Sequence, residues 1–203
     1  MFVSYKSNLK TKYDDLVKLV DVPVVVYVNK FNDETAKKFS EEFNKAAASP
    51  QPIIPIVIDS PGGMVDSLMY MLDICRSSRK PIATVTLGKA ASCGAVLATA
   101  GWHGYRFAGP LARFMIHDVS TICMGKTEEL LVDAHEANRL NESIYRIMAE
   151  NCQKPPRYFW DIVHSRGRAD WYLTAAEAMD HNIVNHVKVP EISIDLTVSY
   201  AFA

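Results

Sequence analysis

Short apolar runs separated by polar stretches recur along the first half of the chain. Three of these runs are rich in β-branched residues and predict buried strands, over residues 22–28 (VPVVVYV), 53–59 (IIPIVID) and 81–87 (PIATVTL). Proline cannot donate a backbone hydrogen bond, so Pro55 predicts that the second strand lies at a sheet edge or carries a bulge. Further strands are expected within residues 105–109 (YRFAG) and 113–119 (RFMIHDV).

Apolar residues spaced by three or four positions predict helices between these strands. The first covers residues 32–48, with Asp33 as the expected cap and an apolar face of Ala36, Phe39, Phe43 and Ala47. Two shorter helices are expected at 65–75 and at about 92–100. The longest covers 126–152, with an apolar stripe of Leu130, Ala134, Ala137, Leu140, Ile144 and Ile147. This alternation of helix and buried strand predicts an α/β protein with a mostly parallel sheet.

Length and composition indicate one domain with a sizeable core. The chain has 203 residues, of which 49% are hydrophobic. Its 22 basic and 23 acidic residues give a net charge of −1, which argues against a nucleic-acid-binding protein. No apolar stretch is long enough to span a bilayer, and the polar start, MFVSYKSNLKTKYDDL, lacks the apolar core of a signal peptide. We therefore expect a cytoplasmic protein without nucleic-acid or membrane partners.

The four cysteines are far apart in the sequence and form no CxxC pair: Cys75, Cys93, Cys123 and Cys152. This spacing does not favour a zinc site or a redox motif, and no metal site is expected. Reduced, mostly buried thiols are the simplest interpretation. Cys93 differs from the others because it follows a candidate nucleophile, where a helix N-terminus would lower the pKa of an accessible thiol.

A lone serine stands among small residues at positions 88–95 (GKAASCGA). Ser92 lies where a predicted strand gives way to a predicted helix, so its hydroxyl would lie near free N–H groups that favour developing negative charge. Residues 60–63 (SPGG) end the neighbouring predicted strand in the same way. If both strands are close in the sheet, the backbone N–H groups of Gly63 and Cys93 could form an oxyanion hole. Ser92 is then either a nucleophile or an ordinary helix-start serine.

Serine nucleophiles need a base and an acid that orients the base. His117 ends the apolar run RFMIH, although a histidine in that position is often an ordinary core residue. Asp170 precedes WYLTAAEA, an aromatic stretch leading into a capped helix, and by itself would be a turn aspartate. Neither residue alone identifies a catalytic site.

Taken in order, these segments resemble those of the family of Clp protease proteolytic subunits (ClpP), from about residue 22 to 188. IDSPGGMV is similar to that family's glycine-rich oxyanion segment, and GKAASCGAVLATAG is similar to its nucleophile segment. RFMIHD resembles the catalytic-histidine segment, and DWYLTAAEAMDHNIV the aspartate segment with its following helix. The resemblance implies Ser92 as nucleophile, His117 as base and Asp170 as acid, with oxyanion donors at Gly63 and Cys93.

The resemblance also implies a fold and an assembly. The fold would be a ClpP/crotonase-like spiral of ββα units in one domain, residues 1–203, with a protruding handle helix at 126–152. Heptameric rings would stack into a tetradecamer, and a ClpX- or ClpA-type AAA+ ATPase would feed in unfolded proteins. ATP would belong to that partner, and this chain itself would need no cofactor.

The sequence departs from the family in several places. Residues 1–21 form a divergent N-terminal segment, residues 189–203 a short apolar tail, and Pro55 and Val57 stand where many relatives have tyrosines. Asp118 and Val119 follow His117 where the family typically has Gln-Pro. The segment before Asp170 is long, which makes Asp161 the alternative acid.

Three other functions remain open on the sequence alone. One is a peptidase of the same fold acting outside a Clp machine, which could use a Ser–Lys dyad with Lys89. Another is a crotonase-type acyl-CoA enzyme, which would not need Ser92 and His117 together. A third is a catalytically silent structural ring subunit.

Overall fold

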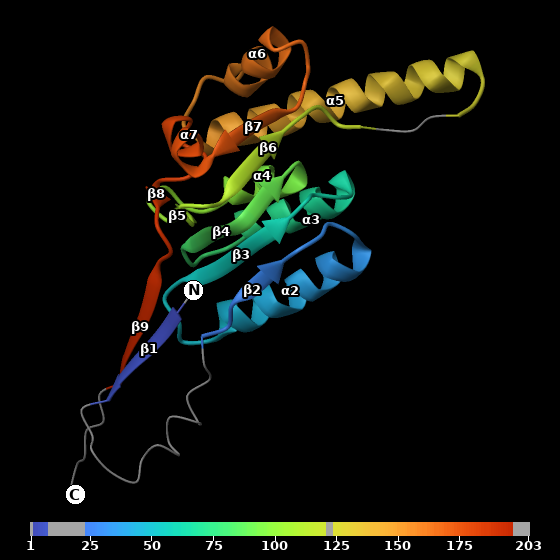
Figure 1. Ribbon diagram of the computed structural model, residues 1–203. Coiled ribbons are helices and arrows are strands. Elements are labelled where there is room, and N and C mark those ends of the chain that lie inside the picture. The colour runs from blue at the N-terminus through green and yellow to red at the C-terminus, as the bar shows by residue number, and fades with distance from the viewer. Residues whose placement is uncertain (1, 8–22, 121–123, 197–203) are drawn as a thin grey trace, which may run out of the picture.

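The computed structural model describes residues 2–7, 23–120 and 124–196, and within this part a mostly parallel sheet carries the fold (Figure 1). Its strands follow the order β2-β3-β4-β5-β8, and β6 pairs with both β4 and β7. Every pairing in this sheet is parallel except that of β6 with β7. The strands are β2 (Val26–Val28), β3 (Ile54–Ser60), β4 (Ile82–Ala91), β5 (Arg106–Ala108), β6 (Arg113–Ile116), β7 (Trp171–Thr174) and β8 (His186–Val187). The predicted α/β architecture with a mostly parallel sheet is confirmed.

Six helices connect these strands in the described residues: α2 (Asp33–Ala48), α3 (Val65–Arg76), α4 (Cys93–Ala98), α5 (Thr127–Asn151), α6 (Tyr158–Ser165) and α7 (Ala175–Asp180). The core is one apolar cluster in which the isoleucines of β3 are fully buried and Phe39 packs on Phe43 with ring centroids 5.7 Å apart. Helix α5 extends beyond the sheet, and its first half leaves the body of the molecule (Figure 1). None of the described helices has the length and apolarity required to cross a bilayer.

The cap of helix α2 lies one residue before the one that the sequence suggested. Asn32, not Asp33, is the N-cap, because its side chain accepts the Thr35 N–H at 2.8 Å while Thr35 Oγ1 accepts the Asn32 N–H. Asp33 lies in the first turn instead, where its charge favours the helix dipole. The buried face also ends at Ala46, whereas Ala47 is exposed.

The predicted sheet edge at Pro55 is wrong, because β3 lies between β2 and β4, and the register shift in its pairing with β4 lies further along, between Ile58 and Ser60. Ile54 donates its N–H towards β4, to the Pro81 carbonyl, so position 55 faces the other side. Pairing with β2 starts only at Ile56, where its partner is Val26. The proline is therefore tolerated because it stands just before the ladder that would need its N–H.

The two ends of the described chain pair with each other, which the sequence did not predict. Strand β1 (Phe2–Ser7) pairs in parallel with β9 (Glu191–Leu196), in a two-stranded sheet that projects from the main body (Figure 1). The predicted N-terminal segment thus includes a strand, and the predicted tail begins with one. Residue 1 and residues 8–21 of the predicted N-terminal segment, and residues 197–203 of the predicted tail, lie outside the described residues.

Candidate active site

Adjacent parallel strands bring the two glycine- and serine-containing segments to one sheet edge. β3 and β4 pair in parallel through Ser60 and Ala90, so SPGG and Ser92 both follow the carboxyl ends of these strands. The approach is close enough to require glycine: a Cβ at Gly62, where φ is +106°, would lie 2.7 Å from Ser92 Cβ. The backbone therefore brings these two segments together, as the sequence predicted.

Gly63 and Cys93 each present a backbone N–H at this edge. Gly63 (φ +148°) forms a parallel bridge with Phe31, in which Phe31 and Met64 donate the hydrogen bonds. The Gly63 N–H is not part of that pattern. Cys93 is the first residue of α4, so its N–H has no acceptor inside the helix. The two donors are linked, because the Cys93 thiol donates to the Gly63 carbonyl at 3.3 Å.

Ser92 occupies a strained turn between β4 and α4. Its φ of +54° and ψ of −122° are uncommon for a residue with a Cβ. The surrounding structure holds this conformation, since the Ser92 N–H donates to the Met115 carbonyl of β6 at 2.8 Å and its carbonyl accepts from Ala95. In α/β-hydrolases, a sharp strand-to-helix turn of this kind exposes the nucleophilic serine.

The register of β6 and β7 places the candidate base and acid. β6 runs beside the last residues of β4, with Met115 opposite Ala91, so His117 emerges next to Ser92. β7 pairs with β6 in the opposite direction, and its first residue Trp171 is opposite Ile116. One step beyond this pair, Asp170 faces His117, and their Oδ1 and Nδ1 atoms are 3.9 Å apart.

The contacts among these three side chains are loose. The 3.9 Å separation of His117 and Asp170 is an ion-pair distance, longer than a hydrogen bond. Asp170 is half exposed, and its other oxygen accepts the Tyr172 hydroxyl at 3.4 Å. Within the described part of the chain, no hydrogen bond joins the Ser92 and His117 side chains. Catalytic hydrogen bonds are often long without substrate, so this geometry is compatible with catalysis.

Ser92 and His117 share a narrow cleft with mostly apolar walls. Its volume is about 20 Å³, enough for about one water molecule. The walls come from α3, α4, α5 and the end of β6, namely Val65, Leu68, Cys93, Val96, Ile116, Val119, Ile144, Tyr145 and Met148. An apolar side chain would be accepted here only if the cleft widened.

The two alternative catalytic residues, Asp161 and Lys89, do not lie beside His117 or Ser92. Asp161 lies on α6 and pairs with Arg157 at 3.3 Å, so it does not replace Asp170 beside His117. Lys89 is exposed on β4, and its backbone N–H donates to the Asp59 carboxylate. Lys89 does not line the cleft that holds Ser92, which gives a Ser–Lys dyad no support.

Burial keeps the described cysteines protonated. Cys75, Cys93 and Cys152 are free and buried, while Cys123 lies outside the described residues. Burial raises the pKa of Cys75 and of Cys152 to about 12. It also raises the pKa of Cys93, although the Gly63 carbonyl acts in the opposite direction. The expectation of reduced, buried thiols is confirmed for these three.

The sequence did not predict that a group of polar residues next to the site would contact one another. Asp118 accepts the Tyr145 hydroxyl at 2.7 Å and lies 3.6 Å from Arg168, and Asn141 accepts the Val119 N–H at 2.6 Å. These pairs are 22 to 50 residues apart in the chain, so no spacing rule connects them. The hints in the sequence were Asp118, which departs from the family's usual residue, and one polar position on the buried face of α5, Asn141.

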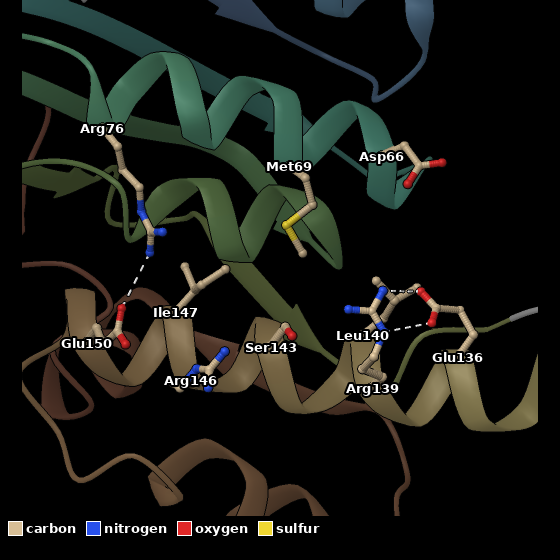
Figure 2. A pocket seen from close by; sticks show the side chains of 10 residues that line it. All are labelled: Asp66, Met69, Arg76, Glu136, Arg139, Leu140, Ser143, Arg146, Ile147 and Glu150. Atoms are coloured by element: carbon tan, nitrogen blue, oxygen red, sulfur yellow. Dashed lines mark hydrogen bonds and ion pairs between the residues drawn. The ribbon is translucent and has the colours of Figure 1, made fainter.

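A larger cleft of about 570 Å³ lies between α3 and α5 (Figure 2). Its charges are balanced, and two ion pairs occupy much of its wall: Arg76 with Glu150 at 3.4 Å and Arg139 with Glu136 at 2.6 Å. It contains none of the predicted site residues and no histidine. Elsewhere in the described residues, no three His, Cys, Asp or Glu side chains are grouped so that they could hold a metal ion.

Comparison with protein families agrees with this arrangement of segments. The Clp protease family matches the chain over residues 7–191, which includes all five predicted site residues and the long helix. The match covers most of the chain, and the mixed α/β fold with its mostly parallel sheet is consistent with it. The chain therefore belongs to the Clp protease family and is a peptidase of the ClpP type.

Proposed function

We propose that this protein is a serine endopeptidase that cleaves unfolded polypeptides with Ser92, His117 and Asp170. The observation that carries the proposal is the strand register, which brings all three residues and two backbone donors to one sheet edge. Three segments from distant parts of the chain meet there. A structural role alone would not require a serine, a histidine and an aspartate in this order.

The proposed reaction follows from these positions. His117 takes the Ser92 proton as Oγ attacks the scissile carbonyl carbon, and the oxygen of the tetrahedral intermediate accepts from the Gly63 and Cys93 N–H groups. His117 then protonates the leaving amine, which leaves an acyl group on Ser92. Water, deprotonated by His117, releases the second peptide and restores the serine. Asp170 orients the imidazole and stabilises its charged form.

This cycle needs two changes from the geometry described above. The His117–Asp170 distance must shorten by about 1 Å to form a hydrogen bond. The cleft must also widen beyond its 20 Å³ to admit a substrate side chain. The widening involves α5, because Ile144, Tyr145 and Met148 form one wall of the cleft. Substrate binding, ring assembly or both would supply the missing contacts.

The proposed substrate class is tested by digestion of matched folded and unfolded proteins. We expect the assembled protein to cut a permanently unfolded polypeptide into short peptides and to leave a stable folded domain intact without a partner ATPase. Mass spectrometry of the products would give the cleavage sites, with apolar residues preferred before the cut because the cleft is apolar. Equal digestion of the folded domain would contradict access through a barrel, and digestion of neither would favour a silent ring subunit.

We further propose that the chain assembles into heptameric rings stacked through α5. The support is an apolar surface on the projecting half of that helix, where Leu130, Leu131 and Val132 are 38%, 50% and 66% exposed. Adjacent exposed apolar residues commonly mark an interaction surface. The sequence placed Leu130 on the apolar stripe of this helix, which packing between rings or core packing would explain equally well, and the buried residues of α5 start only at Asn141. The first half of the helix therefore has its apolar residues available for a partner.

The double variant Leu131→Glu/Val132→Glu tests this surface. We expect it to separate stacked rings and to halve the particle mass measured by sedimentation velocity, because both charges would be buried between rings. Leu111→Glu is the matched control, since Leu111 is 92% exposed but lies outside α5. A double variant with unchanged particle mass would contradict stacking through α5.

The partner is proposed to be a AAA+ ATPase of the ClpX or ClpA type, which would use ATP while this chain uses no cofactor. Family membership is the support. Pro55 and Val57, where many relatives have tyrosines, are buried in β3 and so offer no aromatic docking surface in the described structure. An ATPase-stimulated digestion assay with folded substrate distinguishes this partner from a peptidase that acts outside a Clp machine.

A further inference from the structure

Asp118, the residue directly after the proposed base, is bound on both of its carboxylate oxygens. Oδ1 accepts the hydroxyl of Tyr145 at 2.7 Å, and Oδ2 lies 3.6 Å from Nε of Arg168. The Asp118 side chain is only 17% exposed. A carboxylate in such a setting is held in one orientation, and so is the backbone that carries it.

The two partners of Asp118 come from the elements that flank the site. Tyr145 belongs to α5, and Arg168 stands two residues before Asp170. A second bond reinforces the first attachment, because the Val119 N–H donates to Asn141 of α5 at 2.6 Å. The segment after His117 is thus fastened to the long helix and to the loop of the proposed acid.

The Tyr145 bond is the stronger of the two. The Tyr145 side chain is buried, and both burial and the Asp118 carboxylate raise the pKa of its phenol, so the hydroxyl remains a donor at any physiological pH. The Arg168 contact is longer and half exposed, so solvent screens it. Arg168 nevertheless has a φ of +60°, an uncommon value for a residue with a Cβ, which its surroundings must maintain.

We propose that Asp118 is a positioning residue that sets His117 relative to Asp170 and ties both to α5. This inference rests on the proposed triad. Asp118 and Arg168 join the same two chain segments as His117 and Asp170, so the two pairs act as parallel cross-links between the end of β6 and the start of β7. Without the Asp118–Arg168 pair, the loose 3.9 Å contact of His117 with Asp170 would be the remaining side-chain link described between these two short segments.

Three substitutions separate the contributions of this network. Asp118→Ala removes both contacts and is expected to lower kcat by roughly 10- to 100-fold, because small misplacements of a catalytic group are costly. Tyr145→Phe removes only the hydroxyl and is expected to reduce kcat less, by about 3- to 10-fold. Asp118→Asn keeps an acceptor for Tyr145 and should recover most of the activity. KM should change less than kcat in all three.

A matched control uses another ion pair on the same helix. Arg76→Ala breaks the pair between α3 and Glu150 of α5 (Figure 2), in a cleft that His117 does not line. It is expected to leave kcat unchanged. Equal losses in Arg76→Ala and Asp118→Ala would overturn the proposal, because they would show a general loosening of α5. A loss of about 10⁴-fold in Asp118→Asn would also overturn it, since that is the effect of removing the orienting acid itself.

Hydrogen–deuterium exchange gives a readout that does not depend on activity. In Asp118→Ala and Tyr145→Phe, we expect faster exchange in the peptides covering residues 113–120 and 166–172, with unchanged exchange in β3. If wild type proves inactive, faster exchange would still support the network while the proposed function fails. If the variants are active and show both unchanged exchange and unchanged kcat, the positioning role of Asp118 is overturned while the proposed function stands.

Discussion

Replacing Ser92 by alanine is expected to abolish peptide hydrolysis, with a loss in kcat on the order of 10⁶-fold. Alanine keeps the Cβ and therefore the strained backbone turn at φ +54°, so the substitution removes the hydroxyl and little else. The loss would be measured with a fluorogenic peptide on assembled protein. The thermal midpoint should stay within a degree or two of wild type, which separates lost chemistry from lost folding.

Ser67→Ala is the matched control for this prediction. Ser67 lies on α3, is buried, and its hydroxyl has no hydrogen-bond partner in the described structure. Removing such a hydroxyl is expected to be neutral or slightly stabilising, and kcat should not change. If Ser92→Ala retained wild-type turnover while both variants were pure and assembled, Ser92 would not be the nucleophile.

Replacing Gly63 by alanine is expected to lower kcat by roughly 10²- to 10³-fold, the usual cost of losing an oxyanion-hole donor. A Cβ at Gly63 would collide with the backbone oxygen of Phe31, and φ of +148° is unfavourable for any residue with a side chain. Because Phe31 is fixed by its bridge, the loop with the Gly63 N–H must move. Steady-state kinetics should show the change in kcat with a smaller change in KM.

Gly104→Ala provides the comparison for Gly63→Ala. Gly104 also has a positive φ, +87°, but a Cβ there would meet nothing within 4 Å. The control therefore introduces backbone strain, which costs about 1 kcal/mol of stability, without displacing the site. Comparable activity losses in the two variants would mean that strain, not the position of the donor, explains the Gly63 effect.

Most of the sheet was predictable because its strands are short, β-branched and separated by clear turn residues. The runs before SPGG and before Ser92 became β3 and β4, and their parallel pairing followed from the helix between them. Local sequence was less informative at boundaries. The cap of α2 is Asn32 rather than Asp33. Asparagine also caps well, and the choice between these neighbours depends on which side chain reaches Thr35.

The long helix shows where periodicity misleads. Leu130 and Ile144 both fit the apolar stripe of α5, yet Leu130 is partly exposed and Ile144 is buried. Periodicity reports which residues share a face, but not whether another element covers that face. Here the body of the molecule covers only the second half of the helix, and the first half projects away (Figure 1).

The candidate site was predictable as a set of segments but not as a geometry. The positions of Ser92, His117 and Asp170 depend on pairings between β4, β6 and β7, and β6 and β7 are separated by more than 50 residues of chain. Register across such a separation is set by tertiary packing, which no local pattern contains. For the same reason, the sequence did not predict the contacts of Asp118 with Tyr145 on α5 and with Arg168 before β7.

Labelling with a fluorophosphonate probe tests the central claim most directly, because the probe reacts with serines that a neighbouring base activates. The wild-type protein, Ser92→Ala and His117→Ala would be labelled in parallel, and the modified peptide located by mass spectrometry. The account predicts one adduct, on Ser92, that is absent in both variants. An adduct on another serine, or none in a folded and assembled protein that still cleaves peptides, would contradict it.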